Sequence, residues 1–144
     1  MIIIWGIILF IISAIGFVGQ LLSAVWPETA VRLGLIESEG DVDPAFYADV
    51  RGEALWDTVI LWILPAAAVL LIFKNPIWPY FGLVGGGMYL YFAGRGIFVR
   101  RVLLSRKIAI GHPANVRSAF IFLAIWGMAA IITMRLAIAA LPLP

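Results

Sequence analysis

The sequence has no cysteine, a single histidine, and charged side chains at only 12% of its 144 residues. The absence of cysteine excludes disulfides, thiolate metal sites and iron–sulfur clusters, and one histidine excludes bis-histidine haem ligation. Soluble globular chains carry about 25% charged residues. Here 64% of the residues are hydrophobic instead. This composition excludes a water-soluble enzyme of this size and indicates an integral membrane protein.

Four apolar stretches are long enough to cross a bilayer as helices. A helix rises ~1.5 Å per residue, so about 20 apolar residues cross a hydrocarbon core ~30 Å thick. Such stretches lie at about residues 2–26, 54–73, 80–99 and 119–141, and Pro65 is expected to kink the second. The predicted fold is an all-α, antiparallel up-down bundle of four transmembrane helices that forms one membrane domain over residues 1–144.

The first long connection, residues 27–53, contains signals for short helices. Pro27 suits the first position of a helix that ends near Gly34, and Asp43 followed by Pro44 is typical of an N-cap and a first helical residue. The helix beginning at Pro44 either lies in the interface before a break at Gly52 or continues into the second span. We therefore expect one or two interfacial helices here.

Basic residues are unevenly distributed between the two ends of the predicted bundle. Eight of the ten Lys and Arg residues belong to the end that holds the connections 27–53 and 100–118. The positive-inside rule places both connections in the cytoplasm and both termini outside. The expected location is a bacterial inner membrane in this orientation. Aromatic residues at span ends are expected in the headgroup layer, namely Trp26, Trp78 and Tyr80.

Charges of opposite sign occupy separate segments. All eight acidic residues lie between Glu28 and Asp57, whereas residues 95–117 hold six basic residues and no acidic one. Because topology puts both segments on one membrane face, we expect the acidic connection to lie against the basic one as a charged cap. The competing interpretation is binding of anionic lipid headgroups. Both interpretations concern the same basic residues, Arg100, Arg101, Arg106 and Lys107.

The candidate site consists of ionisable residues inside the predicted spans. Asp57 lies about one turn inside the second span and Arg95 about one turn inside the third, so antiparallel packing places them at one depth. A lone charge in hydrocarbon is costly, so each requires a partner. Glu53 lies one turn before Asp57 on the same face. The three residues form either a structural ion pair that fixes helix register or a site for a substrate or a proton.

Glycines and aromatic residues concentrate in the predicted third span. Gly82 and Gly86 present a smooth face for close helix packing. The alternative is that the nearby run of three glycines unwinds the helix and exposes carbonyl groups to a ligand. Aromatic residues of the second and third spans either pack together or line a cavity for a quinone, a lipid or a flat apolar ligand, and these are Trp56, Trp62, Tyr89, Tyr91 and Phe92.

Three functional hypotheses follow from these features. The leading one is an accessory, assembly or regulatory membrane subunit that associates through its helices with a partner protein or a second copy. The alternative is an oligomeric transporter of a small solute, ion or proton that uses Asp57 and Arg95. The third is an interfacial enzyme or binding protein for a lipid or quinone. No catalytic residue, cofactor, metal or nucleic-acid partner is predicted, and the lipid bilayer is the predicted environment.

Overall fold

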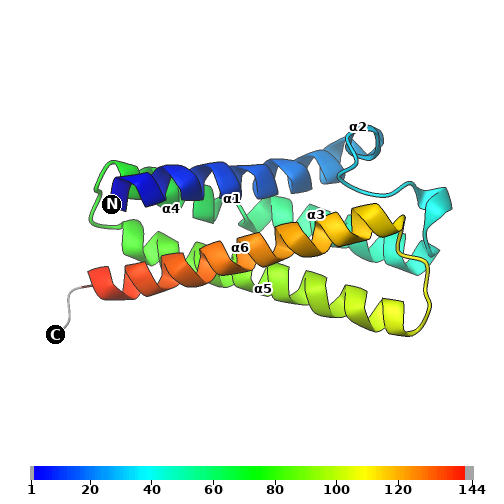
Figure 1. Ribbon diagram of the computed structural model, residues 1–144. Coiled ribbons are helices and arrows are strands. Elements are labelled where there is room, and N and C mark those ends of the chain that lie inside the picture. Colours follow the sequence, from blue (N-terminus) through cyan, green and yellow to red (C-terminus); the bar gives the residue numbers. More distant parts are fainter. Residues whose placement is uncertain (1, 142–144) are drawn as a thin grey trace.

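The computed structural model describes residues 2–141 and consists of helices joined by short connections (Figure 1). Among these residues there is no β-strand, so the all-α prediction is confirmed. In chain order the elements are α1 (Ile2–Val25), α2 (Pro27–Arg32), the 3-10 helix η1 (Glu39–Asp41), α3 (Pro44–Ile60), α4 (Ile63–Ile72), α5 (Trp78–Ser105) and α6 (Pro113–Ala140).

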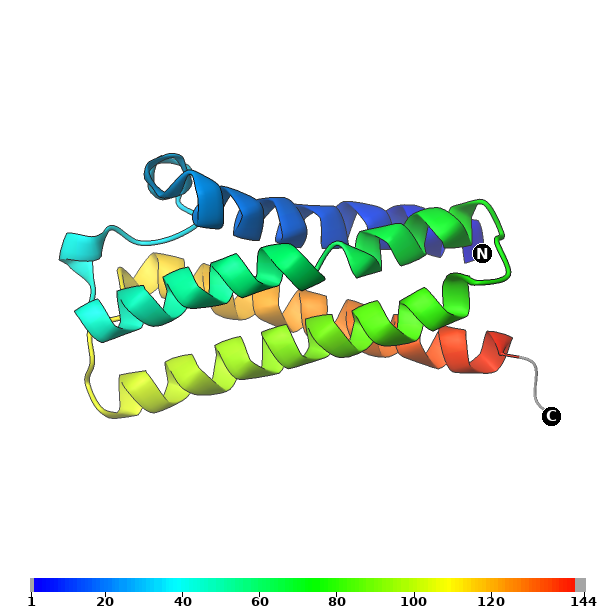
Figure 2. The same ribbon diagram turned by 180° about the vertical axis from the view of Figure 1, so that it is seen from behind.

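The long helices alternate in direction and form an antiparallel bundle. Helices α3 and α4 follow one another as a single bent element that packs on α1; α4 packs on α5, and α5 packs on α6 (Figures 1 and 2). The connections 33–43 and 106–112 lie together at one end, which we call the charged end. The opposite end holds the turn 73–77, the beginning of α1 and the end of α6.

Within residues 2–141, three elements are long and apolar enough to cross a membrane: α1, the α3–α4 element over residues 44–72, and α6. The predicted third span, residues 80–99, lies within α5. This helix has 28 residues but does not reach the same apolarity, because glycine, tyrosine and arginine replace aliphatic residues along it. Composition therefore supports three candidate spans, and the place of α5 depends on its packing.

The break between α3 and α4 has a local cause. Proline has no N–H, so Pro65 cannot donate to the carbonyl of Leu61 four residues earlier, and its ring crowds that carbonyl. The helix accordingly ends at Ile60 and resumes at Ile63. The predicted kink is confirmed as a break one turn before the proline. Upstream, α3 is continuous through Gly52, so the helix that begins at Pro44 runs directly into the apolar segment.

The predicted helix starts in the first connection are also confirmed. Helix α2 begins at Pro27, and Gly34, just after it, has a φ of +69°, a conformation that glycine adopts without strain. The side chain of Asp43 accepts a hydrogen bond of 2.9 Å from the N–H of Ala45 and so caps α3.

The bundle interior is apolar, and apart from Asp57 its buried polar side chains bond to backbone carbonyl groups. The Tyr89 hydroxyl donates to the carbonyl of Ser13 at 2.6 Å, and the Trp126 indole donates to the carbonyl of Ile12 at 2.8 Å. The headgroup prediction is wrong for Trp78, which is 6% exposed and packs in a core cluster with Leu71 and Ala137. Aromatic rings at span ends serve as core residues where a neighbouring helix covers them.

Glycines allow α5 to approach both of its neighbours. A Cβ atom at Gly86 would lie 2.5 Å from the Met134 side chain of α6, and one at Gly82 would meet Ala137. On another side of α5, a Cβ at Gly85 would lie 2.7 Å from the backbone nitrogen of Leu64. Helix α5 is continuous through its glycine run. These glycines therefore pack helices of the same chain against each other.

Gly85→Ala should destabilise the bundle, because the added methyl group would collide with the backbone of α4. Overpacking of this kind costs about 1–3 kcal/mol. Gly87→Ala is the matched control, since a Cβ there meets nothing within 4 Å. Thermal unfolding of the detergent-solubilised protein should show a lower midpoint for Gly85→Ala and an unchanged or higher one for Gly87→Ala. Equal midpoints would contradict the close approach of α4 and α5.

Candidate functional site

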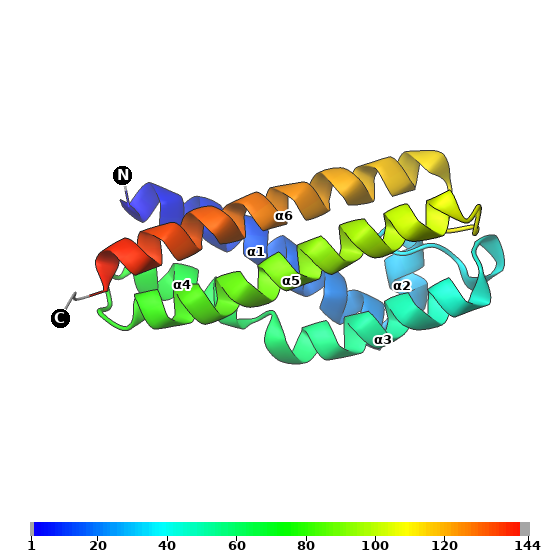
Figure 3. The same ribbon diagram turned by 90° about the horizontal axis from the view of Figure 1, so that it is seen from below.

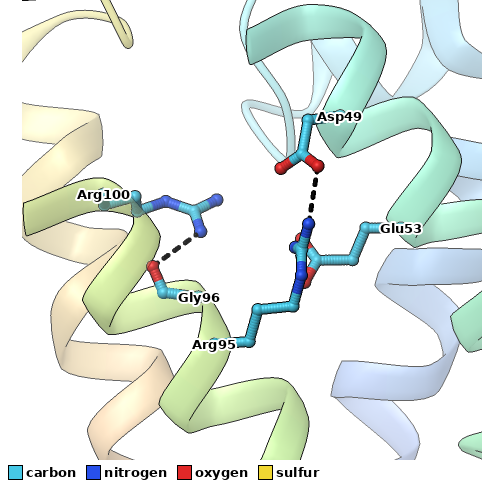
Figure 4. A network of polar contacts seen from close by, with 5 residues as sticks. All are labelled: Asp49, Glu53, Arg95, Gly96 and Arg100. Atoms are coloured by element: carbon cyan, nitrogen blue, oxygen red, sulfur yellow. Dashed lines mark hydrogen bonds and ion pairs between the residues drawn. The ribbon is translucent and has the colours of Figure 1, made fainter. Parts of the chain in front are cut away.

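Arg95 of α5 binds two carboxylates of α3 (Figure 4). Its Nη1 donates to Glu53 Oε1 at 2.7 Å, and its Nη2 donates to Asp49 Oδ1 at 2.5 Å. The Glu53 side chain is only 10% exposed, whereas those of Arg95 and Asp49 are 27% and 39% exposed. Because charge-assisted bonds are stronger where water is displaced, the Glu53 contact contributes more than the Asp49 contact.

Asp57 lies one turn further along the same face of α3 and is left without a partner. The residue is 4% exposed, and its Oδ2 is buried with no hydrogen-bond partner in the structure of residues 2–141. Within that range Arg95 forms ion pairs with Asp49 and Glu53 and none with Asp57. The predicted group of Asp57, Arg95 and Glu53 is thus brought together, but the guanidinium is used by the other two carboxylates.

A pocket of about 400 Å³ lies between α3 and α5, and these four charged residues line it. Of the five aromatic residues considered for a cavity, three line the pocket: Trp56, Tyr91 and Phe92. Tyr89 is buried in the core instead, and the Trp62 indole donates to the carbonyl of Val59. Figures 2 and 3 show α3 and α5 side by side, with α6 on the far side of the pair in Figure 2.

The electrostatics of the pocket favour a positive ligand. One guanidinium faces three carboxyl groups, and Asp57 belongs to the last turn of α3, where the helix dipole is negative. An anion would meet an arginine that is already doubly paired. A bound metal ion is not favoured either, because no group of three or more His, Asp or Glu side chains among the described residues is placed to hold one.

Asp49 was not among the residues singled out from the sequence. The signal was present, because Asp49, Glu53 and Asp57 are spaced four residues apart and so share one helical face. The pattern identifies the face but not how many of its carboxylates one arginine reaches.

At the charged end the two connections meet, but through few charged contacts. Glu37 Oε1 accepts from the backbone N–H of His112 at 3.1 Å and from the Asn115 amide at 2.9 Å. The N–H of Asp43 donates to the carbonyl of Ala109 at 2.8 Å. Beneath these bonds lies a cluster of apolar side chains, with Val42, Phe46 and Ile110 buried. Apolar packing and hydrogen bonds to the backbone thus hold the two connections together.

The basic residues of the charged end form contacts other than ion pairs or are exposed. Arg100 stacks over the Phe46 ring, 5.6 Å from its centroid, and donates to the carbonyl of Gly96 at 3.2 Å (Figure 4). None of the four basic residues considered for a cap or for lipid binding forms an ion pair within residues 2–141, and Arg101, Arg106 and Lys107 are exposed. His112 caps α6, since its Nδ1 accepts from the N–H of Ala114 at 3.3 Å.

Comparisons with protein-family models, curated proteins and solved structures give no match to this chain.

Arg95→Gln should lower the thermal midpoint by several degrees, because it leaves the mostly buried Glu53 carboxylate without its ionic partner. Leaving a buried charged group unpaired costs more than the ~1–3 kcal/mol of an unpaired neutral group. Arg101→Gln removes an exposed arginine from the same helix and should leave the midpoint unchanged in the same melting experiment. A similar loss in both variants would show that Arg95 has no specific structural partner.

Asp57→Asn should leave the midpoint unchanged or raise it, because it neutralises a buried carboxyl that has no compensating contact. The variant keeps the size of the side chain and the ion pair of Arg95. If Asp57→Asn lowers the midpoint as much as Arg95→Gln does, Asp57 takes part in the ion-pair network and is not free for a ligand.

Proposed function

We propose that the chain is a four-span membrane protein that carries a small positively charged solute or a proton, with Asp57 as its binding group. The first part of this proposal concerns α5. With 28 residues it is about 42 Å long, enough to cross a bilayer. It packs against α4 and α6, both parts of candidate spans, so it crosses with them. Gly82, Gly85 and Gly86 face these helices and not lipid, so the low apolarity of that part of α5 is tolerated.

The orientation proposed is the one that the positive-inside rule gives. The charged end, with Arg101, Arg106 and Lys107 exposed, faces the cytoplasm of a bacterial cell. The turn at residues 73–77 and both termini then face outward. This orientation places the pocket near the cytoplasmic side of the membrane.

Single-cysteine labelling should test the number of spans directly, since the chain has no native cysteine. Ser38→Cys and Lys107→Cys should react with a membrane-impermeant maleimide from one side, and Asn75→Cys from the other. A three-span protein in which α5 stays on one side would instead label Asn75→Cys and Lys107→Cys from the same side. That pattern would contradict the four-span arrangement.

The observation that carries the proposed activity is the Asp57 carboxyl, which contributes to the pocket lining, is 4% exposed and has a buried Oδ2 without a partner. A carboxyl group buried in a membrane bundle is costly unless a proton or a cation satisfies it. The break at residues 61–62 lies one turn beyond Asp57 and separates two half-helices. Discontinuous helices with free carbonyl groups are common at the binding sites of transporters. The pocket thus combines a binding group with a place where the helix can bend.

Helix association with a partner protein, which the sequence alone puts first, loses its main support. The glycine face of α5 that favours association is covered by α4 and α6 of the same chain. The apolar outer surface of the bundle suits contact with lipid as well as it suits contact with a partner protein. No feature of the pocket favours a neutral quinone over a cation, because its deepest polar group is an acid. We therefore place the transport hypothesis ahead of the other two.

Current measurements on proteoliposomes should test the proposed function. A rapid jump in the concentration of protons, ammonium or tetramethylammonium on a solid-supported membrane should produce a transient current with at least one of these cations. Asp57→Asn should abolish that current. Asp41→Asn, which removes an exposed carboxylate far from the pocket, should preserve it. Currents that are absent for all three cations, or that survive in Asp57→Asn, would overturn the proposed function.

A further inference from the structure

We propose that the pocket accepts an organic ammonium ion with an aromatic or other flat apolar body, and that this ligand reaches it sideways from the bilayer. This inference rests on the proposed function and specifies its substrate class. It is carried by the size of the pocket, the charge at its base, the aromatic residues at its mouth and the lack of a covering helix.

The size of the pocket fits an organic molecule better than a bare ion. Its volume of about 400 Å³ exceeds the ~30 Å³ that one water molecule occupies in the liquid more than tenfold. Pockets for small organic ligands range from about 300 to 1,000 Å³. A bare monovalent cation would leave most of the pocket filled with water, and a metal ion lacks a set of ligands among the described residues. The remaining positive ligand is an organic cation at the small end of this range.

The charge at the base of the pocket selects an ammonium group. Asp57 Oδ2 is buried without a partner, while the carboxylates of Asp49 and Glu53 are held by Arg95. Arg95 and Arg100 together place two positive charges near Asp49 and Glu53 (Figure 4). One further positive group would therefore match the third carboxylate, Asp57. Arg95 is paired with Asp49 and Glu53 and forms no ion pair with Asp57, so a ligand at Asp57 does not compete with the guanidinium for its partner.

Aromatic rings lie where the body of such a cation would rest. Phe92 is 5% exposed and closes the inner wall, whereas Trp56 and Tyr91 are 61% and 67% exposed at the mouth, one from α3 and one from α5. Cations are attracted to aromatic faces by about 0.5–2 kcal/mol, and a flat apolar body gains further contact with the rings. The two exposed rings thus form an apolar rim around an acidic base.

The position of the pocket favours access from the bilayer. Its lining comes from α3 and α5, and no other helix contributes to it. Figure 2 shows these two helices in front, with α1 and α6 behind them. In a membrane the exposed rings of Trp56 and Tyr91 contact lipid, so an amphipathic cation dissolved in the bilayer meets the rim before it meets Asp57.

Calorimetric titration of the full chain in lipid nanodiscs tests this inference with two probes, tetramethylammonium and benzyltrimethylammonium. Benzyltrimethylammonium should bind about tenfold more tightly, which corresponds to ~1.4 kcal/mol. Asp57→Asn should abolish binding of both probes. Trp56→Leu and Tyr91→Leu should each reduce the advantage of the benzyl probe, and the control Phe98→Leu, an equally exposed aromatic of α5 outside the pocket, should preserve it.

Competition with benzyldimethyldodecylammonium tests the sideways access. Its long tail stays in the bilayer, so it should displace benzyltrimethylammonium from the wild-type protein if the pocket opens to lipid. Failure to compete would overturn this part of the inference.

The outcomes separate this inference from the proposed function. If the two probes bind equally, or the rim variants have no effect, while protons or ammonium still drive an Asp57-dependent current, the function stands and the aromatic substrate class is wrong. If Asp57→Asn binds both probes as the wild type does and no Asp57-dependent current exists, both proposals fail. Gel filtration and the melting midpoint of Asp57→Asn identify any loss that comes from misfolding.

Discussion

The pocket between α3 and α5 is lined by three carboxyl groups and one guanidinium, and this imbalance determines what the bundle can do. Asp49, Glu53 and Asp57 lie on successive turns of one helical face, where an apolar environment makes each uncompensated charge costly. The planar fork of Arg95 satisfies two of them. The third, Asp57, is the most buried and has no partner. If the three carboxyl groups served only stability, the third and unpaired one, Asp57, would not be needed.

The rest of the fold holds this contact in place. Gly85 lets α5 approach the backbone of α4, and Gly82 and Gly86 let it approach α6, so α5 is fixed on two sides. The break caused by Pro65 ends α3 one turn after Asp57 and sets the negative end of that helix beside the carboxyl. On its third side α5 faces α3 across the pocket, where the ion pairs of Arg95 bridge the two helices (Figure 4).

Local features of the structure could be predicted from the sequence, and pairwise contacts could not. Proline and capping residues act within one turn, so the starts of α2 and α3 and the break before Pro65 follow from the residues themselves. The partner of Arg95 depends on the rotation of α3 about its axis and on the reach of a long side chain, which residue spacing does not contain. Burial of Trp78 and the apolar contact beneath the charged connections likewise depend on which helices meet. Composition alone also leaves α5 undecided, because a helix enclosed by two spans needs less apolar surface than an isolated one.

In the proposed mechanism, Asp57 is the group that meets the cation. Infrared difference spectroscopy measures this most directly, by comparing the carboxyl bands of the protein before and after benzyltrimethylammonium is added. The account predicts a ligand-induced change in one carboxyl band that is missing in Asp57→Asn and retained in Asp41→Asn. Binding of the cation without any change in a carboxyl band, or with the same change in Asp57→Asn, would contradict it.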